Sequence, residues 1–117
     1  YMTFYVKKDR AFMSLSEARK ETFTIRKNTW GYLEIDVHTE GEFLSVEHTR
    51  VTTEEFIGNS YRLEYFLNVE ALHPGSNFGR IILESPYETL TYEVVVEKDI
   101  RIIVQTTESL RELLKTI

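Results

Sequence analysis

The chain has 117 residues, of which 42% are hydrophobic and 28% charged, so it is long enough to bury a core as one globular domain. It contains no cysteine, which excludes disulfide bonds, thiolate nucleophiles and cysteine-based zinc or iron–sulfur centres within it. The formal net charge is -5 with both signs mixed along the chain, which argues against nucleic-acid binding because that requires clustered Lys and Arg.

Short runs rich in aromatic and β-branched residues recur along the chain, separated by polar or glycine-containing turns. In chain order, these runs cover residues 3–6, 11–15, 22–26, 30–38, 43–47, 49–53, 61–69, 79–84 and 90–96. Leu33, Ile35 and Val37 alternate with polar neighbours, which is typical of a strand with one buried face. Gly41 falls in a turn where we expect a positive φ. No stretch between the runs is long enough for a crossover helix, which disfavours a parallel α/β sheet.

The last two runs form the clearest unit. Residues 72–77 contain a Pro-Gly pair and local hydrogen-bonding side chains, and they predict a turn around Gly75. The strand that follows has Gly79 on the same face as Ile81 and Leu83, with Phe78 and Ile82 on the other face. A glycine in a strand indicates a bulge or a close backbone approach. A second polar turn at residues 85–89 leads into the last strand, so we expect a β-hairpin.

Residues 106–117 change in character. Ser109, followed three residues later by Glu112, fits a helix-capping box. The apolar residues of this segment fall at helical spacing on one stripe, formed by Leu110, Leu113, Leu114 and Ile117. A helix this short is marginal alone in water, so we expect the stripe to dock on a partner. It either packs back on the sandwich or begins a helical region of a longer protein, and we favour the second.

These elements predict an all-β fold, an antiparallel immunoglobulin-like β-sandwich of about seven strands with a short C-terminal helix. We expect residues 1–10 to form an N-terminal extension, residues 11–99 the sandwich, and residues 100–117 an extra strand and the start of a helical region. No apolar run is long enough to cross a membrane, and the N-terminus does not resemble a signal peptide. We expect Tyr1 to be either a residue left from cloning or the point where a longer chain was cut. Localisation therefore stays open, with the cytoplasm slightly favoured over the cell surface.

No pattern indicates catalysis or a metal centre. The histidines are His38, His48 and His73. The first two lie near acidic residues, but no HxH or HExxH spacing is present, and zinc needs three or four ligands. The sequence has no nucleophile elbow, P-loop or dinucleotide motif, and its serines have no neighbouring histidine pattern. We therefore predict a protein that is not an enzyme, with no cofactor, no metal and no catalytic residue. A hydrolase or metal enzyme using the His38 and His48 region is the least favoured alternative.

Aromatic residues make up 13% of the chain, and outward-facing rings can stack on sugars or contact a protein partner. The rings that fall outside the regular inward faces are Trp30, Tyr32, Phe66 and Tyr87. Among them, Trp30, Tyr32 and Tyr87 are the candidate binding residues. The alternative is that Trp30 belongs to the core or its rim and that two-sided strands account for the others.

The C-terminal half shows a pattern of leucine, glycine, a short loop, a second glycine, an apolar strand, serine, a turn and another apolar strand. The residues that carry it are Leu72, Gly75, Gly79, Ile81, Leu83, Ser85, Tyr92 and Val94. Residues 11–97 thereby resemble the immunoglobulin-like modules at the start of large uncharacterised proteins of clostridial-type bacteria. They are also similar in style to bacterial BACON domains. Two departures are the turn at residues 86–88 and residues 1–10, which have no counterpart.

The resemblance implies a modular fold followed by a helical region, and it carries over no catalytic residue. We expect a structural or protein-interaction module that packs on neighbouring domains of a larger bacterial protein. A carbohydrate-binding module that uses exposed aromatic residues is the alternative. Other proteins or a glycan are further expected partners, whereas nucleic acid and membrane insertion are not expected.

Overall fold

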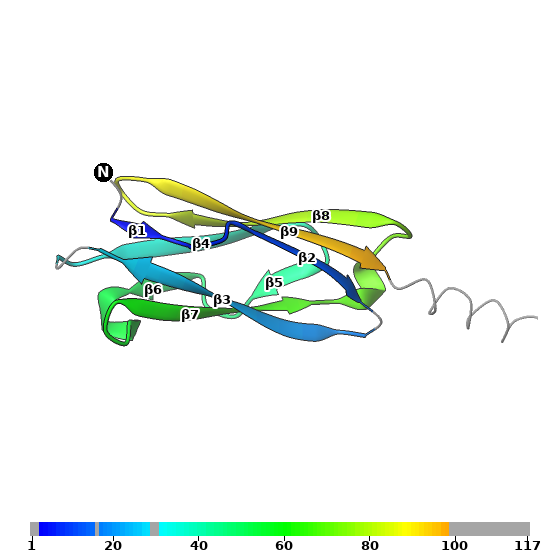
Figure 1. Ribbon diagram of the computed structural model, residues 1–117, viewed down its shortest axis with the longest axis horizontal. Coiled ribbons are helices and arrows are strands. Elements are labelled where there is room, and N and C mark those ends of the chain that lie inside the picture. The colour runs from blue at the N-terminus through cyan, green and yellow to red at the C-terminus, as the bar shows by residue number, and fades with distance from the viewer. Residues whose placement is uncertain (1–2, 16, 29–30, 99–117) are drawn as a thin grey trace, which may run out of the picture.

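The computed structural model describes residues 3–15, 17–28 and 31–98, and in this part the chain forms two packed β-sheets (Figure 1). The all-β sandwich predicted from the sequence is confirmed. Its strands are β1 (Phe4–Tyr5), β2 (Arg10–Leu15), β3 (Arg19–Lys27), β4 (Glu34–Glu40), β5 (Leu44–Val46), β6 (Arg50–Thr52), β7 (Ser60–Leu67), β8 (Ser76–Glu84) and β9 (Thr89–Lys98). Two short 3₁₀ turns, η1 (Thr53–Glu55) and η2 (Val69–Ala71), lie in the connections. The C-terminal helix expected within residues 100–117 lies outside the described residues.

One sheet has four strands in the order β1-β3-β7-β5, and the other has five in the order β2-β9-β8-β4-β6. The described part of the chain therefore has nine strands where the sequence predicted about seven. The larger number arises because the N-terminal part is divided between the sheets and because the short runs at β5 and β6 pair with different neighbours.

The N-terminal part of the chain contributes one strand to each sheet. Phe4 in β1 pairs with Lys27 of β3, whereas β2 runs parallel to β9, with Phe12 opposite Val95. Among the described strands this is the one parallel pair. Phe4 lies within the residues expected to form an extension, and its side chain is fully buried in the core. The chain therefore crosses from one sheet to the other between β1 and β2, and in this way it helps to close the sandwich.

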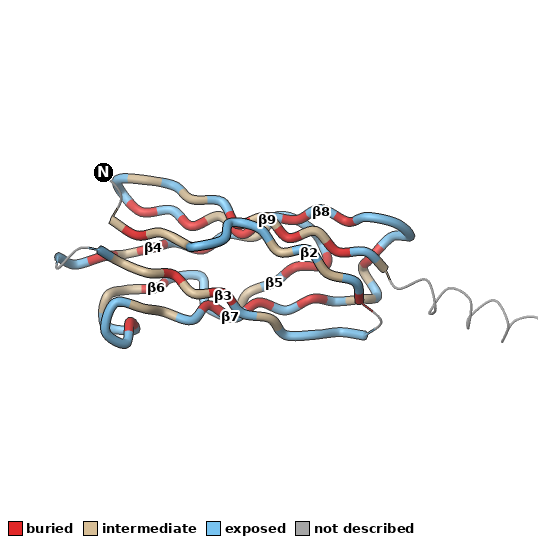
Figure 2. The backbone as a smooth tube through the Cα atoms, viewed as in Figure 1, coloured by how far each residue is buried: buried red, intermediate tan, exposed pale blue. Residues whose placement is uncertain are grey.

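The core follows the two-residue period of the strands, so buried and exposed positions alternate along each strand (Figure 2). The core includes Phe23, Tyr65 and Tyr92, which we call the aromatic cluster. The rings of Phe23 and Tyr92 stack with centroids 3.8 Å apart, and the Tyr65 centroid lies 6.0 Å from that of Phe23. Burial raises the pKa of Tyr65 and of Tyr92, so both phenols stay neutral inside the sandwich.

The predicted hairpin is present as β8 and β9, which pair antiparallel from Ser76 opposite Glu97 to Glu84 opposite Thr89. Its leading turn depends on Gly75, with φ at +89°, and on the buried side chain of Asn77. The Asn77 amide donates to the carbonyl oxygens of His73, Gly75 and Val96, and its oxygen accepts from the His73 amide at 2.8 Å. The polar groups buried at this turn are thereby satisfied.

Gly79 allows the connection between β4 and β5 to pass close to β8, which is one of the two alternatives that the sequence indicated. A Cβ at this position would lie 2.8 Å from Cζ of Phe43 and 2.9 Å from the carbonyl oxygen of Glu40. The register continues through Gly79 opposite Val94, so the glycine marks a close approach and not a bulge. Gly41, with φ at +116°, takes the positive φ expected of it and places its backbone against Gly79.

Glu88, in the turn between β8 and β9, holds the start of the described chain. Its Oε1 accepts hydrogen bonds from the Thr3 amide at 2.7 Å, the Thr3 hydroxyl at 2.6 Å and the Phe4 amide at 3.1 Å. Burial alone would raise the pKa of Glu88, but these hydrogen bonds outweigh it and hold the pKa below its usual value. The carboxylate therefore anchors β1 next to the β8–β9 turn.

Candidate interaction surface

The outer face of the five-stranded sheet carries a row of apolar side chains from three neighbouring strands. Register places Phe12 of β2 and Phe78 of β8 on either side of Val95 in β9. Phe12 is 67% exposed and Phe78 is 75% exposed. We call Phe12, Val95 and Phe78 the aromatic row. Single exposed apolar residues are ordinary, but three adjacent ones at matched register form a continuous apolar strip.

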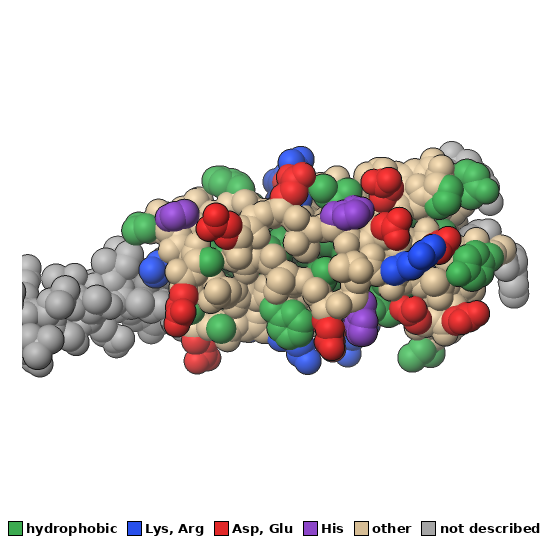
Figure 3. Space-filling view, turned by 180° about the vertical axis from the view of Figure 1, so that it is seen from behind, with side chains coloured by type: hydrophobic (Ala, Val, Ile, Leu, Met, Phe, Trp, Pro, Cys, Tyr) green, Lys and Arg blue, Asp and Glu red, His purple; other side chains and the backbone are tan. Residues whose placement is uncertain are grey.

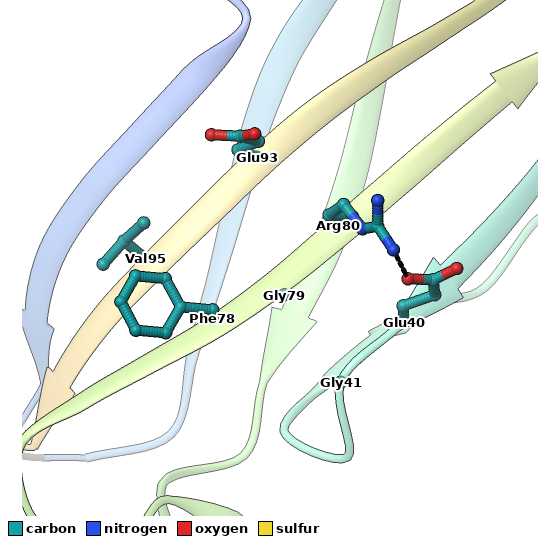
Figure 4. Close-up of a pocket in the computed structure, with 7 residues that line it drawn as sticks. All are labelled: Glu40, Gly41, Phe78, Gly79, Arg80, Glu93 and Val95. Atoms are coloured by element: carbon teal, nitrogen blue, oxygen red, sulfur yellow. Dashed lines mark hydrogen bonds and ion pairs between the residues drawn. The ribbon is translucent and has the colours of Figure 1, made fainter.

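A shallow depression of about 330 Å³ lies beside Phe78, where β4 ends and the chain turns away from β8 (Figure 4). Its lining residues are Glu40, Gly41, Phe78, Gly79, Arg80, Glu93 and Val95. The ring of Phe78 lies beside Val95 at one side, and the Arg80–Glu40 ion pair lies at the other. The depression therefore combines an apolar wall with a polar one.

Charged residues form a second row next to the aromatic row, again across neighbouring strands. Arg10 pairs with Glu93, with Nη2 and Oε2 3.0 Å apart, and Arg80 pairs with Glu40. Arg80 also lies opposite Glu93 in the register. We call these four residues the charged row. Exposed ion pairs of this kind add little stability, so their main consequence is a polar border along the apolar strip.

The free edges of the two sheets differ in length. At the edges lie β1, β5, β6 and β2. The first has two residues and the next two have three each, whereas β2 has six. Short edge strands are one means by which proteins avoid unwanted strand pairing. By this measure β2, which carries Phe12, is the accessible edge.

The predicted binding residues Tyr32 and Tyr87 lie together at the opposite end of the five-stranded sheet. They are 67% and 84% exposed and line a depression of about 330 Å³ with Thr3, Gly31, Leu33, Glu34 and Pro86. Trp30, predicted as the third binding residue, lies outside the described residues. The predicted docking stripe also lies outside them; it comprises Leu110, Leu113, Leu114 and Ile117.

The histidines and acidic residues form no cluster in the described part of the chain. His38 is exposed on β4, and His48 and His73 are exposed in connections. No group of three or more His, Cys, Asp or Glu in residues 3–15, 17–28 and 31–98 is arranged to hold a metal ion. Acidic and basic side chains are interspersed over the face seen in Figure 3. Within those same ranges, no helix has the length and hydropathy of a membrane span.

Sequence reasoning missed the aromatic row as a unit. The alternation of β8 separated Phe78 from the face of Gly79, but Phe78 was not among the rings predicted to lie outside the inward faces. Phe12 was missed because its neighbour Val95 belongs to the far end of the chain and pairs with it in parallel. Such a pairing has no hairpin signature, because the connecting chain passes through the rest of the fold.

Comparison with family models gives a match over residues 2–116, to the N-terminal region of a family of unknown function, DUF5717. Comparison with curated proteins gives no match. Solved structures similar to this chain include three β-sandwich proteins, each of low identity.

The first is a crystal structure of a FixG-related protein from Vibrio parahaemolyticus, with 15% identity and a TM-score of 0.53; the match covers 70% of this chain and 79% of that one. The second is WR4, a C. elegans member of the MSP family, with 12% identity and a TM-score of 0.55, covering 84% of this chain and 99% of that one. The third is an ASH or PapD-like domain of human CEP192, with 6% identity and a TM-score of 0.56, covering 82% and 84%. At these identities the likeness shows the immunoglobulin-like fold alone.

Proposed function

This chain belongs to the N-terminal region of the DUF5717 family, and we propose that it is a non-catalytic protein-interaction module of a larger protein. The observation that carries the proposal is the aromatic row on the outer face of the five-stranded sheet. The low-identity likeness to immunoglobulin-like and PapD-like domains is consistent with such a role and adds the fold only.

The composition of the surface supports docking of a protein. An apolar strip with a charged border resembles the arrangement of protein interfaces, where a desolvated centre is surrounded by polar residues. Phenylalanine rings contribute large contact areas, and their burial is favourable by roughly 1.5–3 kcal/mol each. The adjoining depression gives a partner side chain a place to enter beside Phe78.

The partner that we propose is another part of the same larger protein. The matching family model is an N-terminal region, which implies further sequence in the family beyond this module. The amphipathic stripe predicted from Leu110 to Ile117 is part of the proposed docking, as the first piece of a helical region. A large protein of clostridial-type bacteria is the context that the sequence resemblance suggests for it.

Sugar binding has weaker support. Tyr32 and Tyr87 share one depression, but the comparisons name no carbohydrate-binding protein, and Trp30 lies outside the described residues. We therefore keep protein docking as the proposed function. Catalysis is not part of the proposal; in the described residues no group of three or more His, Cys, Asp or Glu is arranged to hold a metal ion.

The test compares this chain with the longer natural protein in thermal stability and protease resistance. We expect the sandwich to melt at a higher temperature in the longer protein, because docking covers the aromatic row. Phe78→Ser should remove most of this gain, and Leu113→Asp should do the same if the stripe takes part. Tyr87→Ser is the matched control, since it removes an exposed ring at the other end and should leave the gain intact.

Two results would contradict the proposal. One is an equal melting temperature for the sandwich in both proteins. The other is a gain that Phe78→Ser leaves unchanged, since it would place the contact elsewhere on the module.

A further inference from the structure

The edge of β2 lacks the features that usually protect a sheet edge. Six residues long, it contains no proline and no lysine. The β2–β9 register continues without interruption from Arg10 to Leu15, so no bulge twists the edge away. Arg10 is the one charged side chain within the strand, and it already pairs with Glu93.

The parallel register determines which peptide groups of β2 are free. The amide of Glu93 donates to the carbonyl of Asp9 at 2.8 Å. In a parallel ladder this bond places the peptide groups of Ala11 and Met13 towards β9. The N–H and C=O groups of the alternate residues must then point away from the sheet. These outward-facing residues are Arg10, Phe12 and Ser14.

This set of three residues is self-complementary. If two β2 strands pair antiparallel about a two-fold axis at Phe12, Phe12 lies opposite Phe12 and Arg10 lies opposite Ser14 of the other copy. Every outward peptide group of both strands then finds a partner. We propose that a second copy of this chain docks at this edge, so that the two five-stranded sheets join through their β2 strands.

Charge and exposure agree with a second copy as the occupant. The register keeps the two Arg10 side chains apart, because each lies opposite Ser14 of the other copy, and both of these residues are exposed. Phe12, which is 67% exposed in the single chain, gains a phenylalanine beside it on the same face. Arg19 reaches the sulfur of Met13, an inward-directed residue, so this contact lies on the inner side of β2 and leaves the outer edge clear.

The joined sheets would bring two aromatic rows end to end, from Phe78 of one copy through both Phe12 rings to Phe78 of the other. The inference goes beyond the proposed function, because it requires no other part of a larger protein. One six-residue edge buries less than the area typical of permanent dimers, so the association should depend on protein concentration.

The first experiment measures the mass of the 117-residue chain by sedimentation and light scattering from micromolar to near-millimolar concentration. We expect a monomer–dimer equilibrium. Ser14→Pro removes one outward N–H and none that bonds to β9, so it should weaken the dimer at least about tenfold. Ser14→Ala is the matched control, which removes the hydroxyl, keeps the N–H and should leave the equilibrium nearly unchanged.

The second experiment needs no variant and follows backbone amide exchange by NMR at low and high concentration. Amides of Ala11 and Met13 should be protected at both concentrations, because they bond within the sheet. Amides of Arg10, Phe12 and Ser14 should gain protection only at high concentration. A chain that stays monomeric overturns the inference, and so does a dimer in which these three amides gain no protection. Neither result would contradict the proposed docking to a larger protein, because that docking is measured with the longer natural protein.

Discussion

Two groups of aromatic residues in this protein have opposite environments. The aromatic cluster of Phe23, Tyr65 and Tyr92 lies between the sheets, where each residue is at most 9% exposed. The aromatic row has Phe12 and Phe78 on the outer face, at 67% and 75%. The residue types are similar in both, so composition does not distinguish a ring that stabilises the fold from one available to a partner. Strand alternation and register make that distinction.

The largest effect on stability is expected for Phe23, the phenylalanine of the aromatic cluster. Phe23→Ala should lower the free energy of unfolding by about 3–5 kcal/mol, because it leaves a cavity beside Tyr92 and Tyr65. Urea denaturation monitored by circular dichroism measures this. A loss below about 1 kcal/mol would mean that the cluster does not support the core in the way its stacking indicates.

Gly79 separates the two environments, since it faces inward between outward-facing Phe78 and Arg80. Gly79→Ala should destabilise the protein by about 1–3 kcal/mol, because the new methyl group meets the Phe43 ring and the Glu40 carbonyl. Thr91→Ala, at an exposed position on the neighbouring strand, is the control and should be nearly neutral. Thermal unfolding of both variants checks this; equal melting temperatures would show that the Phe43 ring and the end of β4 have room to move.

Acid should weaken the hydrogen bonds of Glu88 to the start of the described chain before it affects the packing of the aromatic cluster. Its carboxylate is more acidic when folded, so its stabilising effect is complete above the ordinary pKa of about 4.5 and is lost as the pH falls through the lowered value. The melting temperature of the parent chain should therefore fall more steeply below about pH 4.5 than that of Glu88→Gln. Thermal melts at a series of pH values test this, and parallel curves would contradict it.

The smallest effect on stability is expected on the outer face. Phe78→Ala should change the free energy of unfolding by less than about 0.5 kcal/mol, because its ring already contacts water. Phe78→Ala and Phe23→Ala replace the same side chain by the same methyl group. Measuring both by urea denaturation therefore compares an exposed ring directly with a buried one. A cost for Phe78→Ala close to that of Phe23→Ala would show that the aromatic row belongs to the core of this chain.

Much of the fold could be predicted from local sequence. Alternation placed Leu33, Ile35 and Val37 inward, and all three are buried. The turn chemistry around Gly75 and Gly41 was confirmed by their positive φ values. These predictions succeed because a strand period and a turn conformation depend on neighbouring residues. The aromatic row was not predicted from the sequence, whereas the predicted binding residues Tyr32 and Tyr87 lie together at the other end of the sheet and stay a prediction.

The sequence by itself determined the all-β class, the β8–β9 hairpin and the inward or outward direction of most strand residues. Only the tertiary structure decided that β1 and β2 enter different sheets, that β2 pairs in parallel with β9, and that Phe12, Val95 and Phe78 form one row. The physical reason is that the direction of a side chain is set within its own strand. Its cross-strand neighbours are set by the register of segments far apart in the chain, which no local pattern encodes.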